Sequence, residues 1–161
     1  MTNIPQVDLH DFTQGNEQKR QAFVKQLGEA FNQVGFVAVK NHGLAPELEQ
    51  KLYQEVKAFF HLPEATKRQY EIPELFGQRG YVSFGKEHAK GRSAGDLKEF
   101  WHFGQALDSK TMNLLGYPEN VRVSECPNFN EVGNQVFKTL ENSGLELLKA
   151  IALYLGLEED Y

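Results

Sequence analysis

The chain has 161 residues, a length that suits one globular domain, and 40% of them are hydrophobic while 24% are charged. The formal net charge of −5 argues against a nucleic-acid partner, because binding to phosphates requires a basic surface. No apolar stretch approaches the ~20 residues of a membrane span, so no membrane partner is expected. The N-terminus lacks the basic start and apolar core of a signal peptide, so we expect a cytoplasmic protein. The single cysteine, Cys126, excludes an internal disulfide.

Two short strands and two helices are predicted in the first part of the chain. Residues 4–9 alternate apolar and polar side chains, which predicts a strand, and the proline in this run favours a sheet edge. Residues 17–34 carry apolar side chains on one face at a 3.6-residue period and predict a helix. A compact apolar run at 36–39 predicts the second strand, and a helix that begins at a proline is expected over 46–62.

The second part of the chain combines a long loop, a strand and a long helix. Residues 71–95 show no helical period and are rich in glycine, so we expect a long loop with one short strand at 81–84. Aromatic side chains at 96–103 favour another strand. An apolar stripe predicts the last helix over 128–155, and the whole reads as a single α+β unit. Such short strands cannot cover the apolar faces of three helices, so an exposed apolar surface is expected.

The glycine-rich segment 77–85 carries side chains suited to contact a substrate. The candidate substrate-facing residues are Arg79, Tyr81, Ser83 and Phe84. An arginine beside an aromatic ring and a hydroxyl can orient a carboxylate or an amide. Two interpretations of Arg79 stay open, a substrate contact or an ion pair with Glu74 or Glu87. For Tyr81, packing in the core is favoured over substrate contact.

Two further short motifs are expected to serve the structure rather than catalysis. In the sequence Asn41-His42-Gly43, the histidine is expected to fix a turn by hydrogen bonding. The adjacent residues Lys98 and Glu99 are expected to form an ion pair at a strand edge or to set the strand register. Neither motif is predicted to bind a metal.

Taken in order, these segments resemble the N-terminal region of the isopenicillin N synthase-like oxygenases. These are non-haem iron enzymes, most of which use 2-oxoglutarate. The resemblance runs along nearly the whole chain and rests on residues 4–9, 39–44, 59–63, 79–81, 96–99 and 155–157. Residues 124–127 depart from the family pattern, which affects one loop only.

The resemblance implies a fold and a chemistry. In the family, such helices pack against a double-stranded β-helix, the jelly roll that holds the iron, and most of this jelly roll would follow residue 161 here. It also implies Fe(II) and 2-oxoglutarate in the complete enzyme, with iron ligands arranged as His-x-Asp and a distant His. None of the five histidines of this chain is followed by a carboxylate two positions later. We therefore expect no catalytic residue, no metal ligand and no bound cofactor in this chain alone.

The expected function is that of the N-terminal half of an Fe(II)/2-oxoglutarate-dependent oxygenase that hydroxylates, desaturates or cyclises a small molecule. The chain alone is predicted to be inactive, with the missing C-terminal jelly-roll segment as its partner. Two alternatives stay open. The chain is a non-catalytic binding or assembly module that keeps the helical scaffold, or a metal-binding module built between protomers from His42 and His102.

Overall fold

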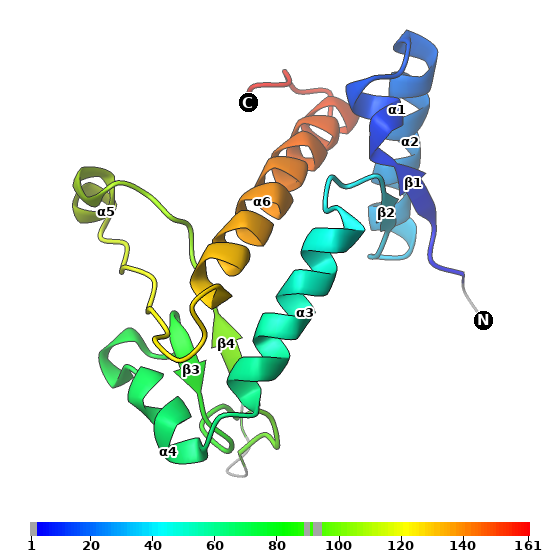
Figure 1. Ribbon diagram of the computed structural model, residues 1–161. Coiled ribbons are helices and arrows are strands. Elements are labelled where there is room, and N and C mark those ends of the chain that lie inside the picture. Colours follow the sequence, from blue (N-terminus) through cyan, green and yellow to red (C-terminus); the bar gives the residue numbers. More distant parts are fainter. Residues whose placement is uncertain (1–2, 89–90, 92–94) are drawn as a thin grey trace. The chain divides into compact units, whose positions relative to one another are not determined.

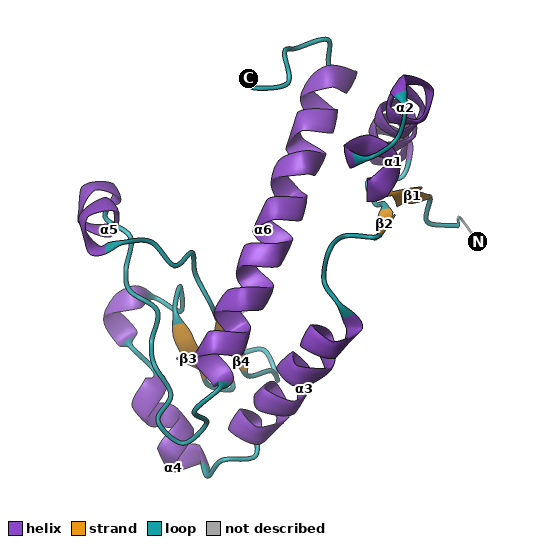
Figure 2. Cartoon of the chain, turned by 45° about the horizontal axis from the view of Figure 1, so that its top comes forward, coloured by secondary structure: helices purple, strands orange, loops and turns teal. Residues whose placement is uncertain are grey.

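A computed structural model of the chain describes residues 3–88, 91 and 95–161. Its backbone divides into two compact units, Met1–Ala45 with Lys138–Tyr161, and Pro46–Phe137. The buried apolar side chains gather into two clusters, one in each unit. Figure 1 shows the course of the chain through these elements, and Figure 2 separates helices, strands and loops by colour.

The first unit combines a small parallel sheet with helices. It contains β1 (Gln6–Asp8), α1 (Leu9–Thr13), α2 (Glu17–Gln33), β2 (Ala38–Lys40) and the later turns of α6 (Phe129–Tyr154). Strands β1 and β2 pair in parallel, with Val7 opposite Val39. The buried core of the unit is formed by Val7, Leu9, Phe12, Phe23, Leu27 and Ala150.

Side-chain caps determine where the helices of the first unit begin. The strand expected over residues 4–9 ends at Asp8, because the Asp8 carboxylate accepts a hydrogen bond from the His10 amide and starts the short helix α1. The Asn16 side chain accepts a hydrogen bond from the Lys19 amide and starts α2 in the same way. Gly35, with a φ of +82°, follows the end of α2 in the left-handed conformation that glycine adopts without strain.

The second unit holds an antiparallel strand pair and the helices around it. Its elements are α3 (Pro46–Phe60), α4 (Glu64–Lys67), the 3₁₀ turns η1 (Arg68–Tyr70) and η2 (Pro73–Leu75), β3 (Gly80–Val82), β4 (Phe100–His102), α5 (Ser109–Leu115) and the first turns of α6. Strands β3 and β4 are antiparallel, with Tyr81 opposite Trp101. The buried core is formed by Phe59, Tyr70, Tyr81, Val123, Cys126 and Phe129.

Two elements of the second unit differ from the sequence prediction. The strand expected over 96–103 shortens to the three residues of β4. Helix α5 is not predicted from the sequence, although the Asp108 carboxylate accepts a hydrogen bond from the Thr111 amide at its start and Gly116 ends it with a φ of +67°. It spans seven residues and leaves Leu114 exposed, so it has no apolar period to reveal it.

Helix α6, of 26 residues, carries both charged pairs and exposed apolar side chains. Its later turns hold ion pairs at helical spacing, such as Lys149 with Glu146 at 2.7 Å. Leu140, Leu145 and Leu148 are 46%, 51% and 62% exposed, in line with the unburied apolar surface expected from the sequence. Within the described part of the chain, neither this helix nor another has the length and apolar content to cross a membrane.

The contact between Gly28 and Tyr154 in the first unit gives a test of the packing. A Cβ at position 28 would meet the Tyr154 ring at 2.2 Å, so Gly28→Ala is expected to lower the free energy of unfolding. Overpacking costs ~1–3 kcal/mol, whereas alanine gains up to ~1 kcal/mol over glycine inside a helix.

The matched control is Gly144→Ala in α6, where no atom lies within 4 Å of the added Cβ. This substitution is expected to stabilise the chain by up to ~1 kcal/mol. Urea unfolding followed by circular dichroism measures both variants. If Gly28→Ala is as stable as Gly144→Ala, the contact with Tyr154 does not form.

Candidate functional site

The glycine-rich segment 77–85 enters strand β3 at a position that only glycine fits. Gly80 has a φ of +76°, and a Cβ there would lie 2.5 Å from the carbonyl oxygen of Tyr70 and 3.0 Å from a methyl group of Val121. Gly80 also forms an isolated bridge with Glu71. The close backbone approach fixes the start of β3, and with it the direction in which each following side chain points.

The β3–β4 pair has two faces with different surroundings, because successive side chains of a strand point to opposite sides. On one face, Tyr81 and Trp101 pack against Phe59, with ring centroids 5.9 Å and 4.8 Å from the Phe59 ring. Tyr81 is only 1% exposed. The other face of the pair presents Gly80, Val82, Phe100 and His102. The inner face thus builds the core, and the outer face is available for binding.

A buried charge network holds the inner face of the pair. The Glu99 carboxylate accepts hydrogen bonds from the Lys67 ammonium at 2.6 Å and from the Tyr81 hydroxyl at 2.5 Å. Lys67 is a buried charge, at 7% exposure, and it also donates to the carbonyl oxygen of Phe60 at 3.4 Å. Burial raises the pKa of Glu99, but the hydrogen bonds from Lys67 and Tyr81 outweigh this effect and leave the pKa below its usual value. Burial, with the hydrogen bond to Glu99, raises the pKa of Tyr81.

Lys98 and Glu99 take different partners, so the ion pair expected between them does not form. The Lys98 ammonium contacts the Glu87 carboxylate and lies 3.6 Å from that of Asp96, on the solvent side. The hydrogen bond from Lys98 lowers the pKa of Glu87. Glu99 turns inward to Lys67 instead. Neighbouring residues of an extended chain face opposite ways, which separates the two side chains.

A cavity of about 400 Å³ opens on the outer face of the β3–β4 pair. Apolar and polar side chains share its lining, among them Phe76, Val82, Phe100, Glu71, Lys86 and His102. The Phe100 and His102 rings lie side by side, with centroids 4.8 Å apart. The Nδ1 atom of His102 lies 2.5 Å from the carbonyl oxygen of Gly77. A concave, partly apolar site with a few polar groups is typical of small-molecule binding.

The four residues proposed from the sequence occupy different environments. Ser83 is 1% exposed, and its hydroxyl donates to the Glu71 carboxylate at 3.2 Å, while the Tyr81 hydroxyl is engaged by Glu99. Phe84 is 53% exposed. The structure thus buries Tyr81 and Ser83 with their hydroxyls bonded, and leaves Phe84 in contact with solvent. Contact of any of these residues with a substrate stays a prediction.

Arg79 forms no ion pair with Glu74 or Glu87 within the described part of the chain. One guanidinium nitrogen donates to the carbonyl oxygen of Gln78 at 2.7 Å, and the buried Nε atom has no hydrogen-bond partner. The guanidinium passes directly over Gly104, where a Cβ would meet its central carbon at 1.9 Å. The arginine therefore keeps unused donors next to the strand pair.

The residues Asn41, His42 and Gly43 form a turn in the first unit. Asn41 (φ +53°) and Gly43 (φ +83°) both adopt left-handed backbone conformations. The Asn41 amide donates to both oxygens of the Asp8 carboxylate, at 2.9 Å and 2.8 Å, and this hydrogen bonding lowers the pKa of Asp8. The Leu44 amide donates to Nδ1 of His42 at 3.4 Å. These contacts tie the turn to the end of β1.

The described residues provide no place for the iron that the resemblance implies. Across residues 3–88, 91 and 95–161, no three His, Cys, Asp or Glu side chains are grouped to hold a metal ion. The residues in these described ranges therefore do not fit the metal, and no step through iron follows from them. What the arrangement can do is bind and orient a molecule.

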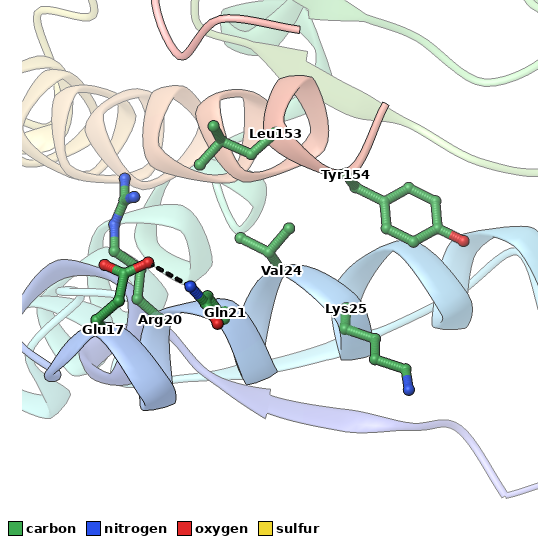
Figure 3. A pocket seen from close by; sticks show the side chains of 7 residues that line it. All are labelled: Glu17, Arg20, Gln21, Val24, Lys25, Leu153 and Tyr154. Carbon is green, nitrogen blue, oxygen red and sulfur yellow. Dashed lines mark hydrogen bonds between the residues drawn. The ribbon is translucent and has the colours of Figure 1, made fainter. Parts of the chain in front are cut away.

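A second pocket, in the first unit, is lined by α2 and the end of α6, and Figure 3 shows its side chains. It has a volume of about 380 Å³. Its polar groups already have partners, since Gln21 donates to Glu17 at 2.6 Å and Arg20 pairs with Glu159 at 2.7 Å. Satisfied surface charges of this kind mark a stabilised helix surface, so we regard the β3–β4 cavity as the candidate site.

Sequence reasoning missed the residues that build this site. Phe76 and Phe100 line the cavity, and the buried Lys67 pairs with Glu99 on the inner face of the strand pair. Strand alternation alone places Phe100 and His102 on one face, and this alternation is the signal in the sequence that could have predicted them as neighbours in a site. Nothing near Lys67 in the sequence points to its partner 32 positions away.

Comparison with known proteins places these features in a family. Residues 4–124 match the family model described as the non-haem dioxygenase in morphine synthesis N-terminal region. A 2-oxoglutarate-dependent dioxygenase, ecdK, of Aspergillus rugulosus is 31% identical over 171 residues, covering 96% of this chain and 49% of the relative. A 1-aminocyclopropane-1-carboxylate oxidase of Dictyostelium discoideum is 26% identical, covering 98% and 44%. The chain spans about half the length of the curated relatives it matches.

Solved structures share the fold of the chain. A 2OG-Fe(II) oxygenase family protein of Caulobacter crescentus superimposes with a TM-score of 0.83 at 34% identity, covering 99% of this chain and 51% of the other. A full-length Neurospora crassa protein, solved in complex with alpha-KG, gives a TM-score of 0.78 at 25% identity, covering 98% and 45%. The likeness again covers one half of the larger proteins.

The Glu99 network predicts a large and pH-dependent loss of stability in Glu99→Gln. Removing the charge leaves Lys67 buried without a counter-ion, which is expected to cost about 3 kcal/mol in the free energy of unfolding. The depressed pKa of Glu99 stabilises the fold above the usual pKa of a glutamate, and this contribution is lost as the pH falls through the depressed value. The difference in the free energy of unfolding between the wild-type chain and Glu99→Gln is thus expected to shrink in acid.

The matched control is Glu87→Gln, which removes the exposed partner of Lys98, both side chains being about half exposed. Solvent screens exposed ion pairs, so the control is expected to change stability little. Urea unfolding of both variants between neutral and acid pH provides the comparison. Equal losses in the two variants would show that Glu99 has no special part in the stability of the fold.

Proposed function

We propose that this chain, which belongs to the family of N-terminal regions of non-haem dioxygenases, forms the N-terminal half of an Fe(II)- and 2-oxoglutarate-dependent oxygenase. The proposed substrate is a small molecule, and the proposed location is the cytoplasm. Hydroxylation, desaturation or ring closure is the proposed class of reaction. The observation that carries the proposal is the family match over residues 4–124, together with a cavity on the outer face of β3–β4. When bound, iron with 2-oxoglutarate would activate O2, which is the oxidant in such reactions.

In this proposal the described residues bind and shield rather than react. Tyr81 and Ser83 act through the strand, because their hydroxyls are committed to Glu99 and Glu71. Of the predicted set, Tyr81 is among the residues that line the cavity, whereas Arg79, whose Nε atom is buried, and the exposed Phe84 are not. Binding in a defined pose and exclusion of water are the contributions that such a surface makes to a reaction.

The partner of this chain is proposed to be a jelly-roll segment that carries the iron ligands. The support is the lack of a metal-binding group among the described residues and the half-length coverage of the relatives. The exposed apolar side chains of α6, Leu140, Leu145 and Leu148, are suited to pack against such a segment. A binding or assembly module without catalysis is the competing proposal.

The reading frame and the activity of its product test this proposal together. We expect the frame beyond the codon of Tyr161 to encode the family's iron ligands, a His-x-Asp and a distant His. The product of that frame is expected to form succinate from 2-oxoglutarate only when iron is present, whereas the 161-residue chain forms none. A frame without these ligands, or a product without iron-dependent turnover, would favour the assembly module. Succinate formation by the 161-residue chain would contradict the proposal that the iron ligands lie in the jelly-roll segment.

A further inference from the structure

We propose that the cavity on the outer face of β3–β4 recognises a neutral, planar group that donates a hydrogen bond, and that His102 accepts this bond through Nε2. The inference rests on the proposed function, since it assigns the chemistry of the substrate part bound by this chain. It makes His102 a specificity-determining residue. It concerns the second unit alone, where all lining residues of the cavity lie.

The hydrogen bond at the far side of the His102 ring determines what Nε2 can do. Nδ1 lies 2.5 Å from the carbonyl oxygen of Gly77, and a carbonyl oxygen can only accept. Nδ1 therefore carries the proton of the neutral ring, and Nε2 is left as an acceptor. The ring makes its contact with Gly77 through Nδ1, and His102 is exposed in the cavity lining, where Nε2 is available to a ligand. The complementary ligand group is an N–H or O–H donor.

The charges around the cavity disfavour a carboxylate as its occupant. The lining contains two carboxylates, Glu71 and Glu87, and one ammonium group, that of Lys86. Lys86 lies 3.8 Å from Glu71, and Lys98 pairs with Glu87, so both cations are committed to these acids. No unpaired cation of the described lining remains to neutralise a ligand carboxylate, whose burial without a partner is costly. A neutral group is therefore the better fit, and 2-oxoglutarate is a poor one.

The aromatic part of the lining favours a planar group. Phe100 lies beside His102, and Phe76 lies on the rim with 88% of its surface exposed. Phe76 has a φ of +49°, a strained conformation for a bulky residue, and the exposed ring gains little packing in return. A ring held in this way gains contact when a flat molecule of a size suited to about 400 Å³ enters the cavity.

Indole and 1-methylindole form the probe pair, since a methyl group in the second replaces the N–H hydrogen that the first can donate. Binding to the 161-residue chain is measured by titration in ¹H–¹⁵N NMR spectra. Indole is expected to bind about fivefold more tightly than 1-methylindole, the scale of one net hydrogen bond, and to shift the signals of β3 and β4. Benzoate, planar but anionic, is expected to bind more weakly than either. Equal binding of the two indoles, or stronger binding of benzoate, overturns the proposal.

Two substitutions test which residues are responsible for the binding of the indoles and for the preference between them. His102→Phe keeps an aromatic ring without the acceptor, so it is expected to abolish the preference for indole over 1-methylindole. Phe76→Gly relieves the left-handed strain and so preserves the fold, and it is expected to weaken both indoles equally. A preference that survives in His102→Phe overturns the role of Nε2. The binding test needs no turnover, so its failure is distinguishable from a failure of the proposed oxygenase function.

Discussion

The Glu99 carboxylate, buried between a lysine and a tyrosine hydroxyl, is the interaction on which the second unit depends. Lys67 comes from α4 and Tyr81 from β3, so one acceptor joins a helix to a strand pair that has only three residues in each strand. Two strands of this length are not stable on their own. The rings of Tyr81 and Trp101 pack on Phe59, and the burial of these apolar surfaces further stabilises the strand pair. Together these contacts hold one face of the pair rigidly.

A fixed inner face gives the outer face a defined shape, and this is what the chain offers to function. Gly80 brings β3 close to the preceding backbone, and the pairing register then places Phe100 and His102 on the cavity side. The resulting surface is suited to bind and orient a molecule, a task that needs rigid support more than reactive groups. The chain belongs to a family described by the N-terminal region of a non-haem dioxygenase, and it spans about half the length of relatives such as ecdK.

The long helices α2, α3 and α6 could be predicted from the sequence, because their apolar period is a local signal. Asn16 and Gly35 delimit α2 within one residue of the predicted range. The ion pair of Lys67 with Glu99 could not be predicted, because the two residues lie 32 positions apart and pair through tertiary packing. The glycine-rich segment stands out in the sequence, but which of its side chains turn inward depends on the strand register. That register is set by the pairing of Tyr81 with Trp101.

The measurement that tests this account most directly is amide hydrogen exchange of the wild-type chain and of Glu99→Gln under native conditions. If Glu99 anchors the strand pair, the amides of β3 and β4 lose protection in the variant, while those of α2 in the first unit keep theirs. Protection that is unchanged in β3 and β4, or lost equally in both units, would contradict the central role of this carboxylate.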